Sequence, residues 1–525
     1  MISRRAWLAG AALPLLAAQG CDAPATPLAG GFVGTSPERG HLLRAAMAQT
    51  PARTQRTRVV IAGGGVAGLA AARALRQRGI EDFVLLELED QAGGNSRATQ
   101  LGGLPCPLGA HYLPLPTDAA HEVQDLLEEL GLRRRVAGRW EYDERHLCHS
   151  PQERLYRDGH WQDGLLPLQD ITAGTLAQYR RFAARVAQLQ RSAPFAMPAQ
   201  RAAFAPEHAA LDAQTMAQWL GREGLDDAQL RWYLDYCCRD DFGAGLATVS
   251  AWAGIHYFAS RHGFHAPGDA AAEREAVLTW PEGNAWLTQR LARPLGERLR
   301  SARVVRRIAT QRQGVVVQAL DPASGQLEQW ECAQCIVALP VFVAARVLAD
   351  PPAFVRAAAA ALRYAPWLVA NVHLRAALAD HGGAAPSWDN VVYGSRALGY
   401  VDAGHQSLEQ RRPDTPRVLS WYQALGDVPG ARAALAQQPW QHWAQQMFEE
   451  LEQAHPDLRA KATHVAVARY GHAMAMPVPG LVQGLRANAA TPRAGALLFA
   501  HADWSGYSVF EEAFTRGHLA GLAAG

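Results

Sequence analysis

The chain has 525 residues, of which 49% are hydrophobic, and a formal net charge of +2. This length allows two or three domains around a large core, and the near-neutral charge gives no indication of a nucleic-acid partner. Lys461 is the only lysine, so arginine supplies almost all of the positive charge.

Residues 1–22 are expected to form an export signal. Arg4-Arg5 precedes an apolar run, residues 6–18, that is too short to span a bilayer and is typical of a signal h-region. The arginine pair resembles a twin-arginine signal, a route that exports folded proteins, so we expect a periplasmic location.

The end of this signal leaves two alternatives open. Cys21 follows a small residue in an imperfect lipobox, which indicates a lipid anchor at Cys21, whereas simple cleavage near Gly20 would leave none. The composition of residues 23–57 is small, polar and proline-bearing, and it predicts a linker with one short helix at 41–48.

Residues 58–99 show the order of a dinucleotide-binding unit. The β-branched run 59–61 predicts a buried parallel strand, followed by a G-x-G-x-x-G turn and an Ala-rich helix at 69–78. A second apolar run ends in Glu87, whose carboxylate can accept hydrogen bonds from the ribose hydroxyls of an adenosine. The same carboxylate would repel the 2′-phosphate of NADP. The pattern therefore predicts a dinucleotide site that does not take NADP.

Each residue of the turn has a mechanical reason. Gly63 permits the tight turn off the strand, Gly65 lets the backbone approach a pyrophosphate, and Gly68 lets the helix pack closely on the strand. The helix N-terminus at Val66 and Ala67 presents unpaired N–H groups and a partial positive charge to the phosphates.

The next turn narrows the choice of dinucleotide. Gly93-Gly94 followed by Asn95-Ser96-Arg97 resembles the extended flavoprotein fingerprint, in which a Gly-Gly-Arg turn lies against the FAD pyrophosphate. Asn95 stands where that fingerprint usually has Arg, and Arg97 is the candidate cation two positions on.

Residues 496–513 resemble the closing motif of the flavin-containing amine oxidase superfamily, an apolar strand followed by an acid and a helix. The resemblance implies that FAD is the cofactor and that Asp503 binds its ribityl or pyrophosphate part. It also implies that Trp504 and Phe510 flank the cofactor, with the helix N-terminus facing the flavin. Glu512 replaces the glycine that the superfamily has before Ala513.

Segments between these ends extend the resemblance. Gly109-Ala110 fits the pair that runs beside the flavin, which places His111 near the isoalloxazine ring; a core histidine is the alternative. The strand at 304–308 resembles one whose main chain, at Val305, contacts adenine. Residues 279–287 and 335–340 resemble a flavin-binding turn and the exit from the nucleotide domain.

The resemblance implies an α/β fold, a Rossmann-type FAD/NAD(P)-binding domain with an interleaved α+β substrate domain. The expected boundaries are as follows: export signal 1–22, linker 23–57, FAD-binding parts 58–115, 279–345 and 491–525, and substrate-domain parts 116–278 (helical) and 346–490.

The expected reaction is hydride transfer from a C–N bond of an amine or amino acid, or from a C–C bond, to flavin N5. Many amine oxidases place a Lys near N5 from the strand after the exit motif, but residues 364–374 contain none. Asn371 or His373 on that strand, His111, and His472 are the remaining candidates. The electron acceptor, oxygen or a redox partner, stays open. A desaturase or isomerase acting on an apolar substrate and a non-catalytic flavin-binding accessory protein are the alternatives.

Two smaller patterns complete the sequence-based predictions. Cys332 and Cys335 are expected to be structural, because no second Cys pair or His accompanies them at metal spacing, and no metal site is predicted. Arg239 beside Asp240 and Asp241 predicts an internal salt bridge, with a clamp for a substrate carboxylate as the alternative.

Overall fold

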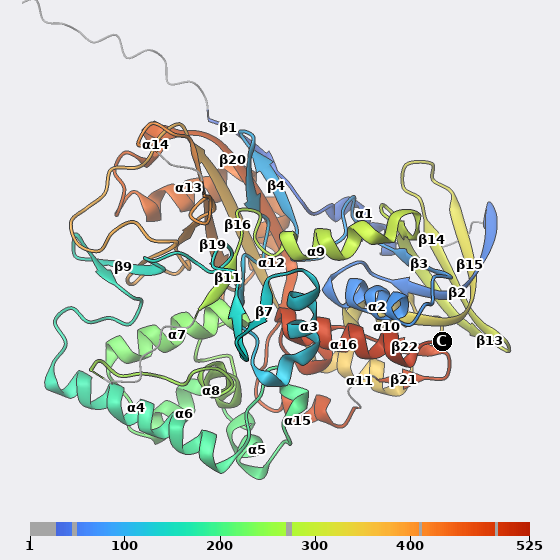
Figure 1. The fold of residues 1–525 in the computed structure, drawn as a ribbon, viewed down its shortest axis with the longest axis horizontal. Helices are drawn as coiled ribbons and strands as arrows, with labels where there is room; N and C mark the ends of the chain where they lie inside the picture. The colour runs from blue at the N-terminus through green and yellow to red at the C-terminus, as the bar shows by residue number, and fades with distance from the viewer. Residues whose placement is uncertain (1–27, 45–49, 269–275, 409–411, 489–491) are drawn as a thin grey trace, which may run out of the picture.

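The computed structural model describes residues 28–44, 50–268, 276–408, 412–488 and 492–525. Two large sheets, each with eight strands, lie side by side and define two halves of the molecule (Figure 1). The predicted export signal at 1–22 and the lipid-anchor residue Cys21 lie outside the described residues. Within those residues, none of the helices combines the length and the hydrophobicity that a bilayer span needs.

The nucleotide-binding half is built on a largely parallel sheet with the order β12-β3-β2-β15-β14-β13, and β22 lies beside β15. The side chains of Val59 and Ile61 face one helical layer, and those of Val60 and Ala62 face the other, so both faces of the central strand are buried. The strands are β2 (Arg53–Ala62), β3 (Phe83–Leu86), β12 (Leu299–Arg300), β13 (Val304–Gln311), β14 (Gly314–Leu320), β15 (Leu327–Val337), β21 (Arg493–Ala494) and β22 (Leu497–Phe499).

Helices cover both faces of this sheet. On one face they are α2 (Val66–Gln77), α3 (His121–Glu129), α9 (Ala285–Ala292) and α16 (Phe510–Ala523); on the other they are α10 (Val341–Val347) and α11 (Ala353–Ala361). Helix α16 lies directly on α2, because a Cβ on Gly517 would sit 2.0 Å from the Ala67 carbonyl oxygen.

The other half is built on a mixed sheet with the order β1-β20-β16-β19-β18-β17-β9-β10. Alternation along β16 places Leu368 and Ala370 on a face covered by α13, while Trp367 and Val369 point to the opposite face. The strands are β1 (Ala29–Phe32), β9 (Glu153–Arg157), β10 (His160–Asp163), β16 (Tyr364–Leu374), β17 (Asp389–Val392), β18 (Tyr400–Asp402), β19 (Arg417–Ala424) and β20 (Ala462–Ala475).

The helices of this half form two groups. One group covers the outer face of the sheet: α12 (Ala431–Gln437), α13 (Trp440–Leu451) and α14 (Leu458–Lys461). The other forms the green layer at the lower left of Figure 1: α4 (Ala173–Ser192), α5 (Pro206–Asp212), α6 (Met216–Arg222), α7 (Ala228–Phe242), α8 (Ala251–Ala259) and, nearby, α15 (Leu481–Arg486).

Short antiparallel ribbons lie outside the two large sheets. They are β4 (Ala98–Leu101) with β5 (Leu104–Pro107), β6 (Tyr112–Pro114) with β11 (Val277–Thr279), and β7 (Arg133–Val136) with β8 (Arg139–Tyr142). The ribbon β6–β11 joins the end of the first cofactor segment to the start of the second.

The structure corrects the expected domain boundaries in three places. Residues 29–32, expected in a linker, form β1, which pairs in parallel with β20, and α1 (Pro37–His41) follows it. Helix α3 lies beyond the expected boundary at 115, yet its Leu126 and Leu127 belong to the core of the nucleotide-binding half. The part expected to be helical, 116–278, also contributes β9 and β10 to the second sheet.

Candidate functional site

The glycine turn after β2 has little room for side chains. Gly63 has φ +102°, and a Cβ there would lie 2.3 Å from the Ala338 carbonyl oxygen. A Cβ on Gly68 would lie 1.9 Å from the Gly63 carbonyl oxygen, so this glycine brings the first turn of α2 against the strand end. Both positions act as the sequence predicts.

Gly65 differs from its neighbours because it faces open space. It precedes α2 with φ −70°, and the one heavy atom near a Cβ there would be the Gly94 Cα, at 3.9 Å. Gly94 itself has φ +59°, and the Gly93 amide donates to the Gly64 carbonyl at 2.8 Å. Two glycine backbones thus border a cradle at the N-terminus of α2, where Val66 and Ala67 begin the helix. This arrangement fits a pyrophosphate.

Glu87 is fixed at the tip of β3. Its Oε2 accepts from the Gly64 amide at 2.7 Å and its Oε1 accepts from the Glu89 amide at 2.8 Å. Burial raises the pKa of Glu87, and the two amides and the nearby Arg97 oppose that rise. The carboxylate retains lone pairs beyond these two bonds, so it fits the predicted ribose contact.

Arg97 and Asn95 shape the turn in different ways. Arg97 is buried, and its Nε donates to the Gly94 carbonyl at 2.9 Å, which brings its charge to the glycine cradle. The Asn95 side chain turns away and donates to the Ala473 carbonyl at 2.7 Å. Its own carbonyl accepts from the Ala110 amide at 2.9 Å, which places the Gly109-Ala110 pair directly beside the turn.

The C-terminal motif contributes mainly through its backbone. Asp503 Oδ2 accepts from the Val341 amide at 2.9 Å and from the Tyr364 hydroxyl at 2.6 Å. Burial alone would raise its pKa, but His501 and these donors lower it overall. The carboxylate therefore anchors the start of α10, and its contact with the ribityl or pyrophosphate part of FAD stays a prediction.

Three side chains named from the resemblance lie in packed surroundings. Trp504 packs against Phe354 and Phe499, and Phe510 stacks on Phe514 with ring centroids 5.7 Å apart. Val305 is buried in the core beneath the sheet. Contacts from these positions to a cofactor would come from the main chain, as the resemblance implies for Val305 and for the α16 N-terminus.

The candidate catalytic residues are not brought together. Asn371 donates through Nδ2 to the Pro107 carbonyl at 2.9 Å and accepts from Ser420, so both ends of its amide are engaged. His472 is exposed and stacks on Phe342 with ring centroids 4.5 Å apart. Although part of its surface is exposed, partial burial of the ring lowers its pKa to about 4, and the charges of Arg432 and Arg44 add to this shift. In the described part of the chain, Asn371 and His472 form their hydrogen bonds and ring contacts with residues other than His111.

His111 lies in a box of aromatic rings. It stacks on Tyr422 with centroids 4.3 Å apart, and the rings of Tyr112 and Trp388 lie 5.0 and 5.5 Å away. Burial lowers the pKa of His111 to about 3, so the imidazole is neutral at physiological pH. Because it directly follows Gly109-Ala110, this box adjoins the predicted flavin position.

Sequence reasoning missed the carboxylates that border this box. The Tyr112 hydroxyl donates to Asp240 Oδ2 at 3.4 Å, and Asp389 accepts from the Tyr236 hydroxyl. Burial raises the pKa of Asp240 to about 7 and that of Asp389 well above its usual range, with Glu153 adding repulsion. Both carboxyl groups are half-buried, and burial is the largest cause of the rise in each pKa.

The expected internal salt bridge of Arg239 is present, but its partner is neither of the two adjacent acids. Arg239 pairs with Asp235 at 2.9 Å, one helical turn earlier, while Asp241 pairs with Arg261 at 3.2 Å. The i,i+4 spacing on α7 favours the first pair, and it leaves Asp240 to face Tyr112. The run of adjacent acids indicates charged contacts at this end of the helix, but it does not indicate which residue each acid contacts.

Strand β16, which follows the exit motif and carries a lysine in many amine oxidases, has none in this chain. Val369 of β16 is paired in register with Tyr422 of β19, so its side chain lies on the face that carries the aromatic box. Lys461 lies elsewhere and pairs with Asp457 at 2.6 Å.

Cys332 and Cys335 are buried free thiols in β15, in keeping with a structural role. Among the described residues, no group of three or more His, Cys, Asp or Glu could hold a metal ion.

Comparison with known proteins places this geometry among flavoproteins. A family described as flavin containing amine oxidoreductase matches residues 66–520. The putative flavin-containing monoamine oxidase AofH of Mycobacterium tuberculosis is 29% identical over 299 residues, 56% of this chain and 59% of that protein. The chain thus spans less than two thirds of the curated relatives that it matches first.

Solved structures show the same fold at low sequence identity. Putrescine oxidase bound to putrescine superposes with a TM-score of 0.67 at 17% identity, covering 90% of this chain and 99% of that one. Cyclohexylamine oxidase from Brevibacterium oxydans IH-35A gives a TM-score of 0.64 at 17% identity, covering 89% and 98%.

Proposed function

The chain belongs to the flavin-containing amine oxidoreductase family, whose cofactor is FAD, and we propose that it oxidises a small cationic amine at the carbon next to nitrogen. The observation that carries the proposal is the aromatic box at His111 with Asp240 and Asp389 at its edge. Carboxylates and aromatic faces together suit an ammonium group, through ion pairing and cation–π attraction.

FAD, held at the glycine cradle, would supply the hydride-accepting position. The chain's own residues bind and orient the substrate. Asp240 attracts the ammonium group, and its pKa of about 7 suits it to take the proton that must leave nitrogen before oxidation. His111 stays neutral and adds no repulsion. Tyr112 holds the Asp240 carboxylate in place.

The surroundings favour an amine over an amino acid. Arg239 is held by Asp235 and by the carbonyls of Arg396 and Ala397, and Arg261 is paired with Asp241. These arginines of the helical layer are therefore engaged, whereas a substrate carboxylate would require an arginine that is not. The carboxylates at the box likewise oppose the alternative of an apolar desaturase or isomerase substrate, since burying them against hydrocarbon is costly.

The electron acceptor and the location complete the proposal. Oxygen or a redox partner accepts the electrons, and Val369, in place of a lysine on the inner face of β16, favours the redox partner. Export by the twin-arginine route to the periplasm, with a lipid anchor at Cys21 as one form, remains proposed from the sequence.

Anaerobic mixing of the purified yellow protein with amines, polyamines and amino acids tests the substrate. Amines are expected to bleach the flavin absorbance quickly, and amino acids slowly or not at all. Admission of air then separates an oxidase from a dehydrogenase. Full FAD occupancy without bleaching by any amine would contradict the proposal.

A further inference from the structure

Residues 28–44, which we call the N-terminal strap, connect the substrate sheet to the cofactor-binding edge of the other half. At its start, β1 pairs with β20, the Val33 amide donates to the Val467 carbonyl at 2.9 Å, and the Thr35 hydroxyl donates to the Arg469 carbonyl at 2.9 Å. In Figure 1 the blue chain runs from β1 to α1 across the top of the molecule. The strap is thus anchored on one half before it reaches the other.

The strap first contacts the arginine of the glycine cradle. The Gly34 carbonyl accepts from Arg97 Nη1 at 2.7 Å, while Nε of the same guanidinium donates to Gly94. Gly34 has φ +86°, and a Cβ there would lie 3.0 Å from Leu108 Cδ1. The strap therefore fixes Arg97, the cation predicted to lie at the pyrophosphate, and Gly34 packs tightly against Leu108.

The strap next binds the acidic turn that follows the ribose-binding acid. The Ser36 amide donates to Glu89 Oε1 at 3.0 Å, and Arg39 Nη2 donates to Asp90 Oδ1 at 2.7 Å. Arg39 also lies 3.8 Å from Glu89 Oε2. The Glu89 amide in turn donates to Glu87 Oε1. Two hydrogen bonds, both through Glu89, thus connect the strap to the Glu87 carboxylate, which is predicted to bind the ribose.

The end of the strap packs near the strand assigned to adenine. Leu42 and Leu43 lie against the cluster that contains Val304, the residue before Val305. The Leu43 carbonyl accepts from Arg346 Nε at 2.8 Å. The strap thus contacts residues beside the predicted pyrophosphate, ribose and adenine positions of FAD.

We propose that the N-terminal strap is part of the FAD site and closes over the adenosine diphosphate half of the cofactor. The strap holds Arg97 directly, through the Gly34 carbonyl. It holds Glu87 indirectly, because Ser36 binds the Glu89 side chain and the Glu89 amide binds Glu87. Release of FAD then requires the strap to detach, so the strap sets how long the cofactor stays bound. The inference rests on FAD binding and not on the identity of the substrate.

The test measures the rate of FAD release from the full-length holoprotein, followed as the rise in flavin fluorescence after dilution. Arg39→Ala removes the strap's ion pairs with the acidic turn and is expected to speed release about two- to fivefold. Gly34→Val forces a β-branched residue into a left-handed conformation and is expected to speed release about tenfold or more.

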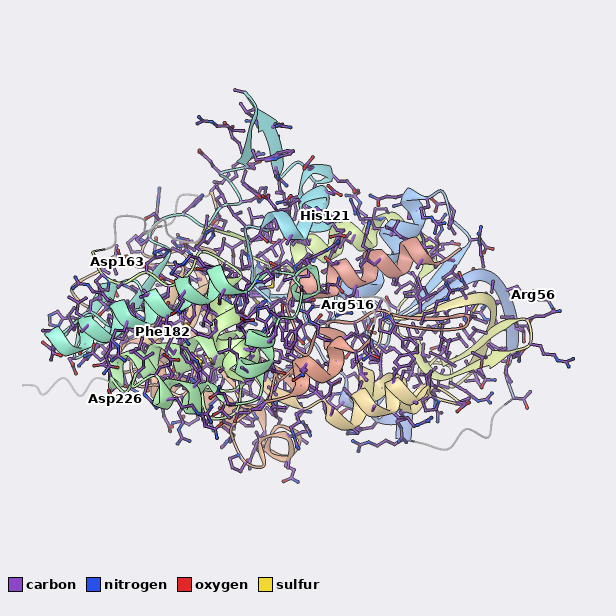
Figure 2. All side chains as sticks on the ribbon, turned by 90° about the horizontal axis from the view of Figure 1, so that it is seen from below. Arg56, His121, Asp163, Phe182, Asp226 and Arg516 are labelled. Atoms are coloured by element: carbon purple, nitrogen blue, oxygen red, sulfur yellow. The ribbon has the colours of Figure 1, made fainter. Side chains whose placement is uncertain are left out.

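Arg56→Ala is the matched control, because Arg56 forms an exposed pair with Glu331 at the far end of the same half. Figure 2 shows Arg56 at the right edge of the molecule. Its release rate should equal that of the unmodified protein. Release at the unmodified rate in both strap variants would overturn the proposal. Because no substrate is added, this result is independent of amine turnover.

Discussion

The hydroxyl of Tyr112 lies 3.4 Å from Asp240 Oδ2, and it joins the end of the flavin-side segment to the middle of the helical layer. Tyr112 comes from β6, directly after His111, while Asp240 comes from α7, more than a hundred residues later. Their contact sets a carboxylate at the rim of the aromatic box, which makes Asp240 the first residue to change.

Replacing Asp240 by Asn is expected to weaken amine capture. The substitution keeps the shape of the side chain but removes the charge that attracts the ammonium group, a loss of about 1.5–3 kcal/mol for a charge-assisted hydrogen bond. The apparent second-order rate of flavin reduction by an amine should therefore fall by about tenfold or more. Anaerobic stopped-flow mixing measures it.

Asp226→Asn is the control for this change. Asp226 accepts from Gln178 on the exposed surface near the start of α7, and Figure 2 shows it at the opposite edge of the molecule from Arg56. Its reduction rate should match the unmodified protein. Equal rates in D240N and D226N would show that Asp240 does not bind the substrate.

The pH dependence follows from the same carboxylate. Burial raises the pKa of Asp240 to about 7, so its charged form dominates above that pH and disappears below it. kcat/KM for an amine should fall by about tenfold per pH unit below pH 7. His111 has a pKa of about 3 and contributes no limb between pH 5 and 9. Rate profiles over this range check both statements.

In D240N the acid limb near pH 7 should flatten. Asp389 also has a raised pKa, so a limb that persists unchanged in D240N would assign the titration to Asp389 instead.

The neutral Asn also removes a stability cost. Native Asp240 binds its proton more tightly than the unfolded chain does, so the stability of the unmodified protein falls as pH rises towards 7. The unfolding midpoint of D240N at pH 8 should therefore be no lower than that of the unmodified protein.

The cofactor half could be predicted because its signals are local. Gly63, Gly65 and Gly68 lie in one strand–turn–helix unit, and Glu87 directly follows the next strand along the chain. Backbone geometry forces these residue types at these spacings, so a short stretch of sequence is sufficient.

The substrate site could not be predicted in this way. Asp240 of α7 contacts Tyr112 of β6 across 128 positions of the chain, and Arg239 pairs with Asp235 on its own helix instead of with its neighbour. The strand β1 was missed for a related reason: a four-residue edge strand, Ala29–Phe32, gains its stability from β20, far away in the sequence. Long-range packing decides these features, and a single sequence does not record it.

Alanine at Gly65 and at Gly68 should separate cofactor binding from folding. At Gly65 a methyl group would meet only Gly94 Cα at 3.9 Å, so the apoprotein should fold normally while FAD affinity falls by about tenfold or more. At Gly68 it would lie 1.9 Å from the Gly63 carbonyl oxygen, which should destabilise the protein by about 1–3 kcal/mol or more. Chemical denaturation and FAD titration measure the two effects.

Gly221→Ala serves as the control for both glycine changes. Gly221 lies in α6 with no heavy atom within 4 Å of a built Cβ, so alanine there should leave stability unchanged or slightly higher. If G65A unfolds as easily as G68A, the space at Gly65 is needed for the fold and not for the cofactor.

Glu512 is the next position whose substitution should lower stability. It is fully buried, and it accepts from the Tyr507 hydroxyl at 2.6 Å, from Ser505 and from the Ala199 amide. Arg516 donates to Ser505 at 2.8 Å, and burial lowers its pKa to about 10, an effect that the Glu512 charge opposes. Figure 2 shows Arg516 between the helical layer on the left and the nucleotide-binding half on the right.

Glu512→Gln replaces one acceptor oxygen by an NH₂ group, so one of its buried donors loses its acceptor, and it removes the negative charge that favours the charged form of Arg516. Leaving a buried donor unsatisfied costs about 1–3 kcal/mol, which should appear as a lower denaturant midpoint with an unchanged slope. Glu449→Gln, at an exposed pair with Gln445, should change stability by less than about 0.5 kcal/mol. Equal midpoints for the two variants would mean that Ser505 and Tyr507 stabilise Arg516 without the carboxylate. Glu512, which replaces the superfamily's glycine, would then not be needed to stabilise these buried groups.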